Sequence, residues 1–89
     1  RHAGLDLEAA EWLAEQGVVN IGVDAPSIDK PDDKRFSGHL ICRKYALTNT
    51  ENLCSLDQVA GRRFLYFGLP LKIRRGTGSP VRAVAVLPG

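Results

Sequence analysis

The first residues of the chain show a helical alternation of apolar and polar positions. Apolar side chains recur at helical spacing on one face while glutamates line another, which predicts a helix that buries one side. Asp6 stands where an N-cap is expected, and Gly17 stands where a left-handed residue ends a helix. We therefore predict a helix over residues 7 to about 16. Its apolar face consists of Leu7, Ala10, Leu13 and Ala14.

The next segments alternate between strand and loop patterns. Residues 18–23 are rich in β-branched side chains and predict a buried strand, so the helix-to-strand order indicates α/β packing. Residues 24–35 carry Asp, Pro, Ser and basic side chains, which are typical of a long loop. Residues 36–45 fit a short helix, which we favour, although an extended segment stays open. Residues 46–51 predict a second strand.

The last third of the chain has β character. Ser55 is predicted to cap a short helical turn that Gly61 ends. Two or three strands are expected after it, because apolar stretches recur at residues 64–67, 69–73 and 81–87. Pro70 cannot donate a ladder hydrogen bond, so it predicts a break, a bulge or an edge position. The glycine-rich residues 76–80 predict a tight connector before the last strand.

Composition favours a single small globular domain over a disordered tail. The chain has 89 residues, of which 44% are hydrophobic and 25% charged. A domain of this size buries only about 60% of the surface of its unfolded chain, so its stability without a partner would be marginal. Because the chain begins at Arg1 and enters a helix pattern at once, we expect residues 1–89 to be a fragment of something longer.

Charge and cysteine content exclude several partners and indicate a cytoplasmic protein. A net charge of +2 is too small to indicate nucleic acid, and no apolar run approaches the roughly 20 residues that would cross a membrane. The local basic cluster lacks interleaved aromatic residues, so a solvated turn explains it better than nucleic-acid binding. Cys42 and Cys54 are expected to be free thiols in a reducing cytoplasm. The basic cluster consists of Lys72, Arg74, Arg75 and Arg82.

Widely shared catalytic motifs are absent from the sequence. It has no HExxH, no GxSxG, no P-loop and no GxGxxG after a strand. Taken alone, His39 and Glu51 would be ordinary surface residues. Asp24 and Ser27 follow a predicted buried strand at its carboxyl end, where α/β proteins often place ligand contacts, although a capping role is the alternative.

A family resemblance extends in order over nearly the whole chain. The sequence resembles the C-terminal portion of the cyclase family, which includes bacterial kynurenine formamidase and isatin hydrolase. The residues that carry the resemblance are Gly4-Leu5, Ala9-Ala10-Glu11-Trp12-Leu13, Gly22-Val23-Asp24 with Pro26-Ser27, His39, Glu51-Asn52-Leu53, Leu69-Pro70-Leu71-Lys72-Ile73 and Gly76-Thr77-Gly78-Ser79-Pro80-Val81-Arg82-Ala83.

The resemblance implies a metal-dependent hydrolase that opens an amide bond. It implies that His39 and Glu51, twelve positions apart, are metal ligands. Imidazole nitrogen and carboxylate oxygen suit zinc, which we expect, and also manganese. Gly78 and Ser79 match a loop that lines the pocket or a water path in relatives, although a simple turn is the alternative. The expected substrate is a small N-formyl or cyclic amide, with N-formylkynurenine and tryptophan catabolism as the leading setting.

The resemblance also implies a fold and a missing part. The expected class is α/β, with a barrel-like mixed sheet core and flanking helices, assembled as a homodimer or higher oligomer. The other metal ligands of the family lie in an upstream His-x-Gly-Thr-His-x-Asp motif that residues 1–89 lack. A catalytic zinc normally has three protein ligands. We therefore expect this chain alone to be inactive, with the rest of the site on a missing N-terminal half or partner chain. A noncatalytic structural or interaction fragment is the alternative.

Overall fold

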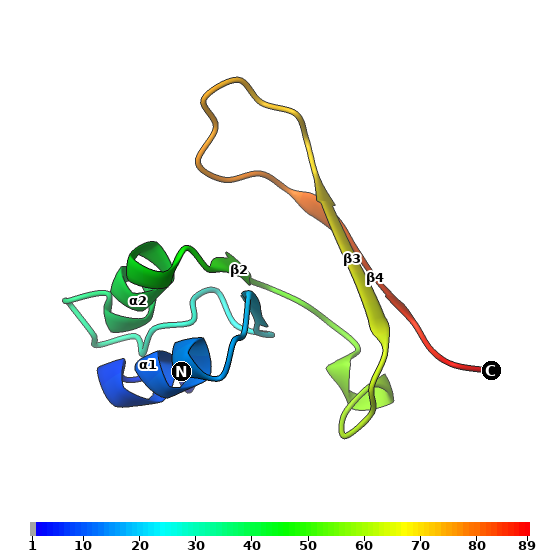
Figure 1. Cartoon of the computed structure of the whole chain (residues 1–89), viewed down its shortest axis with the longest axis horizontal. Helices are drawn as coiled ribbons and strands as arrows, with labels where there is room; N and C mark the ends of the chain where they lie inside the picture. Colours follow the sequence, from blue (N-terminus) through cyan, green and yellow to red (C-terminus); the bar gives the residue numbers. More distant parts are fainter. Residues whose placement is uncertain (1) are drawn as a thin grey trace. The chain divides into compact units, whose positions relative to one another are not determined.

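A computed structural model describes residues 2–89, which form helices, a 3-10 turn and strands in two compact units (Figure 1). The first unit extends to Cys54 and the second comprises Ser55–Gly89. Mixed α/β content confirms the predicted class. The structure shows no closed barrel within these residues, so the barrel-like core stays a prediction. No helix among residues 2–89 is long and apolar enough to span a membrane.

Helix α1 covers Leu7–Glu15, as its apolar spacing predicts. The Asp6 side chain accepts a hydrogen bond from the Ala9 N–H at 2.8 Å, which satisfies one of the free donors at the helix start. Gly17 ends the helix with φ of 84°, a backbone conformation that side chains disfavour. Ala10 is fully buried, whereas Trp12 is 60% exposed.

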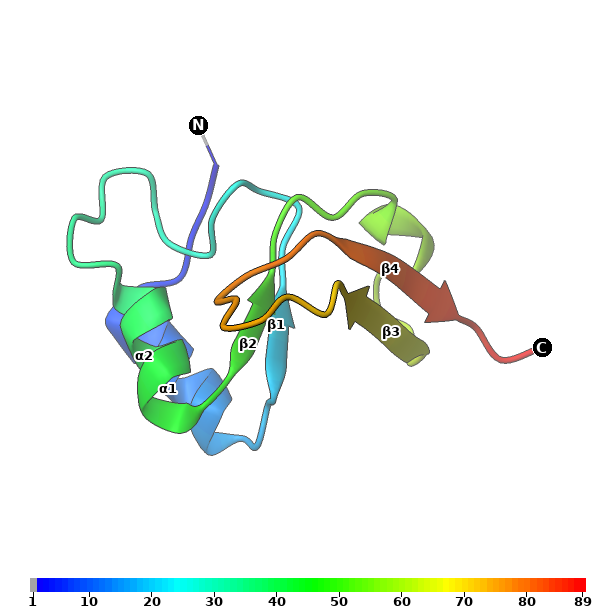
Figure 2. The same cartoon turned by 90° about the horizontal axis from the view of Figure 1, so that it is seen from above.

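In the first unit one short strand follows each helix, and the two strands pair in parallel (Figure 2). Strand β1 covers Asn20–Gly22 and strand β2 covers Thr48–Thr50, with Ile21 opposite Asn49. The predicted strand over residues 18–23 is therefore too long. Ile21 inside the strand is buried, whereas Val19, which lies just before the strand, is 76% exposed.

Helix α2 covers Ser37–Tyr45, so the helical alternative for this segment is confirmed. The long loop before it ends at Phe36, whose left-handed backbone, with φ of 55°, turns the chain into the helix. The Asp33 carboxylate accepts hydrogen bonds from the backbone N–H groups of Arg35 and Ser37, at 2.8 and 3.2 Å. These bonds give the start of α2 the partners that the helix itself cannot supply.

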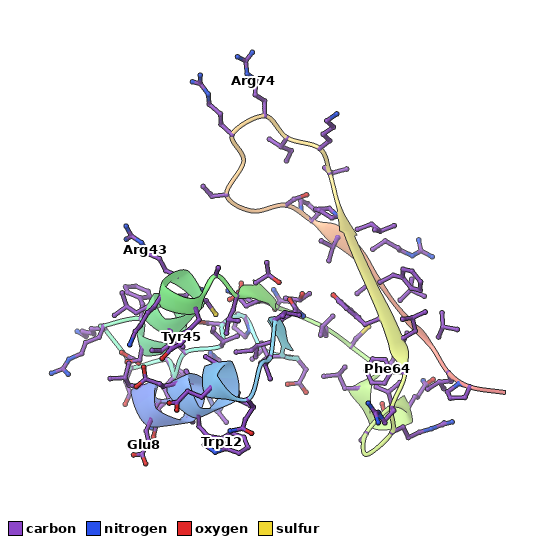
Figure 3. The ribbon with its side chains drawn as sticks, viewed as in Figure 1. Glu8, Trp12, Arg43, Tyr45, Phe64 and Arg74 are labelled. Atoms are coloured by element: carbon purple, nitrogen blue, oxygen red, sulfur yellow. The ribbon has the colours of Figure 1, made fainter. Side chains whose placement is uncertain are left out.

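Helices α1 and α2 lie side by side in both views (Figures 1 and 2). Glu11 on α1 accepts hydrogen bonds from the Lys44 ammonium at 3.0 Å and from the Tyr45 hydroxyl at 3.1 Å. Figure 3 shows Tyr45 between the two helices, while Glu8 and Trp12 project from the opposite side of α1. One polar cluster on the surface therefore joins the two helices.

The core of the first unit is small. Ile21, Ile28 and Cys42 form its buried centre. Cys42 is a buried free thiol and Cys54 an exposed one, as expected from the sequence, and desolvation raises the pKa of the Cys42 thiol. The partly buried residues around this centre are Leu5, Leu13, Val18, Val23 and Leu47.

The second unit is a 3-10 turn, η1 at Leu56–Gln58, followed by an antiparallel hairpin. Strand β3 covers Leu65–Pro70 and strand β4 covers Val81–Val86. Pro70 is the last residue of β3, opposite Val81, so the strand expected over residues 69–73 ends early where the ladder loses its donor. The predicted Ser55 cap is wrong, because its side chain makes no capping bond.

Candidate functional site

His39 lies in the first turn of α2, with its side chain 40% exposed. The Phe36 ring meets the imidazole edge to face, with centroids 6.4 Å apart and planes at 80°. Phe36 is itself 61% exposed. The imidazole is therefore open to solvent but has an aromatic neighbour at its side.

Asp29 holds the inner edge of this imidazole. Its Oδ2 lies 2.6 Å from the Nδ1 of His39, and its Oδ1 accepts the Gly38 N–H at 2.5 Å. The residue is only 2% exposed. An ionised carboxylate can only accept hydrogen bonds, so in the neutral imidazole Nδ1 carries the proton and the outer nitrogen, Nε2, keeps a free lone pair.

Glu51 follows β2 directly and faces the outer nitrogen of His39. Its Oε2 lies 3.6 Å from Nε2, and its side chain is 31% exposed. That distance is too long for a hydrogen bond. Two ligands of one tetrahedral zinc, each about 2.1 Å from the metal, are about 3.4 Å apart. The pair therefore has the separation of two ligands that share a cation.

Backbone hydrogen bonds fix the segment that carries Glu51. Before it, the Thr50 carbonyl accepts the Val23 N–H at 2.9 Å. After it, Asn52 has a left-handed backbone with φ of 57° and donates its N–H to the Ala25 carbonyl at 2.9 Å. The loop after β1 and the segment after β2 are thus tied together on both sides of Glu51.

Gly38 allows Asp29 to approach the helix closely. A Cβ atom at this buried position would lie 2.7 Å from Oδ1 of Asp29 and 3.0 Å from Cδ1 of Ile28. A side chain at position 38 would therefore displace the carboxylate that contacts His39.

The residues described fit part of a metal site. Across residues 2–89, no group of three or more His, Cys, Asp or Glu side chains is arranged to hold a metal ion. His39 and Glu51 match two ligands in chemistry and separation, whereas Asp29 contacts the far edge of the imidazole. A complete centre thus requires ligands from outside these residues.

The sequence of the chain is similar to known proteins of one family. A family model described as "Putative cyclase" matches residues 1–30. The chain is 43% identical over 74 residues to a protein from Bordetella petrii named kynurenine formamidase, covering 83% of this chain and 35% of that relative. It is 41% identical over 80 residues to a protein of the same name from Bacillus cereus, covering 90% of this chain and 38% of that relative.

These matches show that the chain is similar to the cyclase family. It spans 35 to 38% of the length of these two curated relatives. A third relative, named kynurenine formamidase from Paracidovorax citrulli, is 41% identical over 81 residues, covering 91% of this chain and 37% of that relative. The family resemblance expected from the sequence is confirmed.

Two of the other four residues predicted for the pocket, Ser27 and Ser79, have local hydrogen-bond partners in the structure. Ser27 accepts the Asp29 N–H on its hydroxyl at 3.0 Å, while Asp24 is exposed. Ser79 accepts the Leu71 N–H at 2.8 Å, and Gly78 lies exposed beside it. Asp24 and Ser27 belong to the first unit and Gly78 and Ser79 to the second, and their pocket role stays a prediction.

Asp29 was not predicted from the sequence. Asp24 and Ser27 in the same loop were predicted instead, because they stand nearest to the end of the predicted strand. The signal for Asp29 was its place after the apolar Ile28 in an otherwise polar loop, which is consistent with burial. Only the fold shows that it reaches a histidine ten positions further along.

Proposed function

We propose that this chain supplies two ligands, His39 and Glu51, to a metal-dependent amide hydrolase of the arylformamidase type. The observation that carries the proposal is the 3.6 Å separation of the free Nε2 from the Glu51 carboxylate. Relatives named kynurenine formamidase support the substrate class. The proposed reaction is hydrolysis of an N-formyl or cyclic amide. The leading candidate is the hydrolysis of N-formylkynurenine by water to kynurenine and formate, a step of tryptophan catabolism.

The proposed cofactor is a divalent cation, zinc first and manganese as the alternative. Neutral imidazole and carboxylate suit both ions. When bound, such a cation supplies Lewis acidity, which polarises an amide carbonyl and activates water. His39 presents the lone pair of Nε2, and Glu51 presents carboxylate oxygens that are partly solvent-exposed and so accessible.

The exposed Phe36 ring beside His39 offers an apolar surface near the proposed reaction centre. An aromatic face of this kind suits the aryl group of an arylformamide, since aromatic rings prefer edge-to-face or offset contacts. Asp24, Ser27, Gly78 and Ser79 remain proposed pocket residues. In this proposal they shape the pocket and orient the substrate.

The remaining ligands are proposed to come from outside this chain. A catalytic zinc normally takes three protein ligands, and residues 2–89 offer two with suitable geometry. We propose that residues 1–89 are the C-terminal part of a larger cytoplasmic hydrolase domain. A homo-oligomer, in which a partner chain completes the site, fits the same requirement.

The experiment is a hydrolysis assay on the intact polypeptide, meaning the whole protein in which these residues occur. Kynurenine release from N-formylkynurenine is followed before chelation, after chelation, and after zinc or manganese is restored. Chelation should abolish turnover and one of the two ions should restore it. His39→Ala and Glu51→Gln should each lower both bound metal and rate at least tenfold, because each removes a proposed ligand.

Glu15→Gln is the matched control, because it neutralises an exposed carboxylate at the end of α1. It should keep full metal content and full turnover. Full metal and full rate in either ligand variant would overturn that residue's assignment. Absence of both metal and hydrolysis in the wild-type protein would instead favour a noncatalytic role for the chain.

A further inference from the structure

The Asp29 carboxylate is buried, so its hydrogen-bond partners decide whether the position is tolerated. It is 2% exposed, and a buried carboxylate is unfavourable unless hydrogen bonds compensate for the lost water. Its two oxygens have different partners: Oδ1 accepts the Gly38 N–H and Oδ2 contacts Nδ1 of His39. One oxygen is therefore directed to the imidazole.

Helix capping alone does not account for this arrangement. Asp33 already accepts hydrogen bonds from Arg35 and Ser37 at the same end of α2. The Asp33 carboxylate bonds to Arg35 and Ser37, whereas Asp29 touches both the helix backbone and the ring. The two aspartates thus share the helix start but differ in whether they reach the histidine.

We propose that Asp29 is a positioning residue that fixes the tautomer and orientation of His39 toward a divalent cation. This inference rests on the proposed function, because it takes Nε2 as a ligand atom. The hydrogen bond made by one ring nitrogen decides which nitrogen is free to bind metal. With Asp29 on Nδ1, the lone pair is on Nε2, which faces Glu51.

Three local features hold Asp29 in place. Its own N–H donates to the Ser27 hydroxyl at 3.0 Å. Leu5 donates its N–H to the adjacent Ile28 carbonyl at 2.8 Å, and the Ile28 side chain is fully buried. Gly38 leaves the space that Oδ1 fills. The carboxylate is therefore anchored through its backbone, its neighbour and its helix contact before any cation is present.

The test compares Asp29→Asn with Asp33→Asn in the intact polypeptide. In Asp29→Asn the amide oxygen can still accept the Gly38 N–H, while the amide NH2 faces Nδ1 and favours the opposite tautomer. Asp33→Asn makes the same chemical change at the same helix end without touching the ring. The first readout is the ring 15N shifts of His39 in metal-free protein, assigned by their loss in His39→Gln. The second is affinity for zinc and for manganese.

Wild-type His39 should carry its proton on Nδ1. Asp29→Asn should move it to Nε2 and weaken the binding of the preferred ion about 10- to 100-fold, the range seen when an outer partner of a ligating histidine is removed. Asp33→Asn should change neither. Circular dichroism of each variant reports whether helix content is kept.

An Nε2-protonated His39 in the wild-type protein would overturn the inference, and this readout stands even if Asp29→Asn fails to fold. So would a folded Asp29→Asn protein whose tautomer and metal affinity match those of Asp33→Asn. Wild-type protein with the expected tautomer and no affinity for either ion would overturn the proposed function and the cation part of the inference together. In that case a shift of the proton from Nδ1 to Nε2 in Asp29→Asn would still show that Asp29 controls the tautomer, so the hydrogen-bond part of the inference would stand.

Discussion

Gly38 controls the geometry around His39 because it lacks a side chain. It is buried in the first turn of α2, and the Asp29 carboxylate occupies the space next to its Cα. Glycine inside a helix is normally unfavourable by about 1 kcal/mol relative to alanine. Its presence here indicates that close approach of the carboxylate matters more than helix propensity.

Gly38→Ala should therefore destabilise the protein despite the better helix propensity of alanine. The added methyl would stand 2.7 Å from Oδ1 of Asp29 and 3.0 Å from Ile28, so the pinned carboxylate must move. We expect a net loss of about 1–2 kcal/mol in the free energy of unfolding, since overpacking outweighs propensity. Urea unfolding measures it.

Gly78→Ala is the control for that substitution. A Cβ at Gly78 meets nothing within 4 Å, so the free energy of unfolding should change little. Equal stability of the two variants would show that the space beside Asp29 can expand without cost.

At this scale the sequence predicted residue types better than residue partners. His39 and Glu51 were identified through family resemblance, and the structure places them 3.6 Å apart. Asp29 was not identified, because its role depends on burial and on contact across ten residues of loop and helix. A hydrogen bond between side chains leaves no periodic signal in a sequence.

The start of α2 depends on a charged acceptor. The Ser37 side chain and the Arg35 N–H donate to the Asp33 carboxylate and lower its pKa below the ordinary value of 3.8. A carboxylate whose pKa is lowered by folding stabilises the folded state above its unfolded pKa, and this contribution is lost as the pH falls through the folded pKa.

Removing this charge should thus change how stability depends on pH. The wild-type protein should be more stable than Asp33→Asn at pH 7, and the difference should persist down to about pH 4 and shrink at lower pH. Urea midpoints of both proteins at several pH values measure it. A difference that stays constant down to the acid limit would rule out the ionised Asp33 carboxylate as its source.

Element prediction succeeded where local chemistry decides the outcome. Asp6 and Gly17 mark the two ends of α1 as expected, since an N-cap residue and a left-handed residue act within one turn of the helix. Strand ends were less predictable. The strand that ends at Pro70 depends on its pairing partner, and β1 is shorter than its apolar run because few residues pair with it.

The two units differ in how much surface they bury. The first has a buried centre at Ile21, Ile28 and Cys42. In the second, residues 55–89, no residue is fully buried, and large apolar side chains of the hairpin such as Leu65, Leu69 and Val86 are exposed. A two-stranded hairpin without a covering layer is only marginally stable in water.

Hydrogen exchange on the 89-residue chain should reveal this difference. Paired amides of β3 and β4 should exchange much faster than helical amides of α1 and α2, because local opening of the hairpin exposes little buried apolar surface. Measurement at several protein concentrations provides the control. Hairpin amides as protected as the helices at high dilution would contradict the prediction, whereas protection that rises with concentration would indicate association of copies.

The order of the predicted elements indicated an α/β chain and composition favoured a single domain, but neither predicted the division into two units. The division depends on which apolar side chains pack against one another in the folded chain. The sequence pattern of residues 65–70 and 81–86 indicates only that these segments are strands. The barrel-like core and the oligomer stay predictions of the family resemblance.

The central claim is that His39 and Glu51 bind one cation through Nε2 and a carboxylate oxygen. A crystal structure of the zinc-loaded intact polypeptide, with anomalous data at the zinc edge, tests it most directly. The account predicts an anomalous peak within about 2.2 Å of both atoms, with Asp29 still hydrogen-bonded to Nδ1. A zinc peak away from this pair, or one bound to His39 through Nδ1, would contradict it.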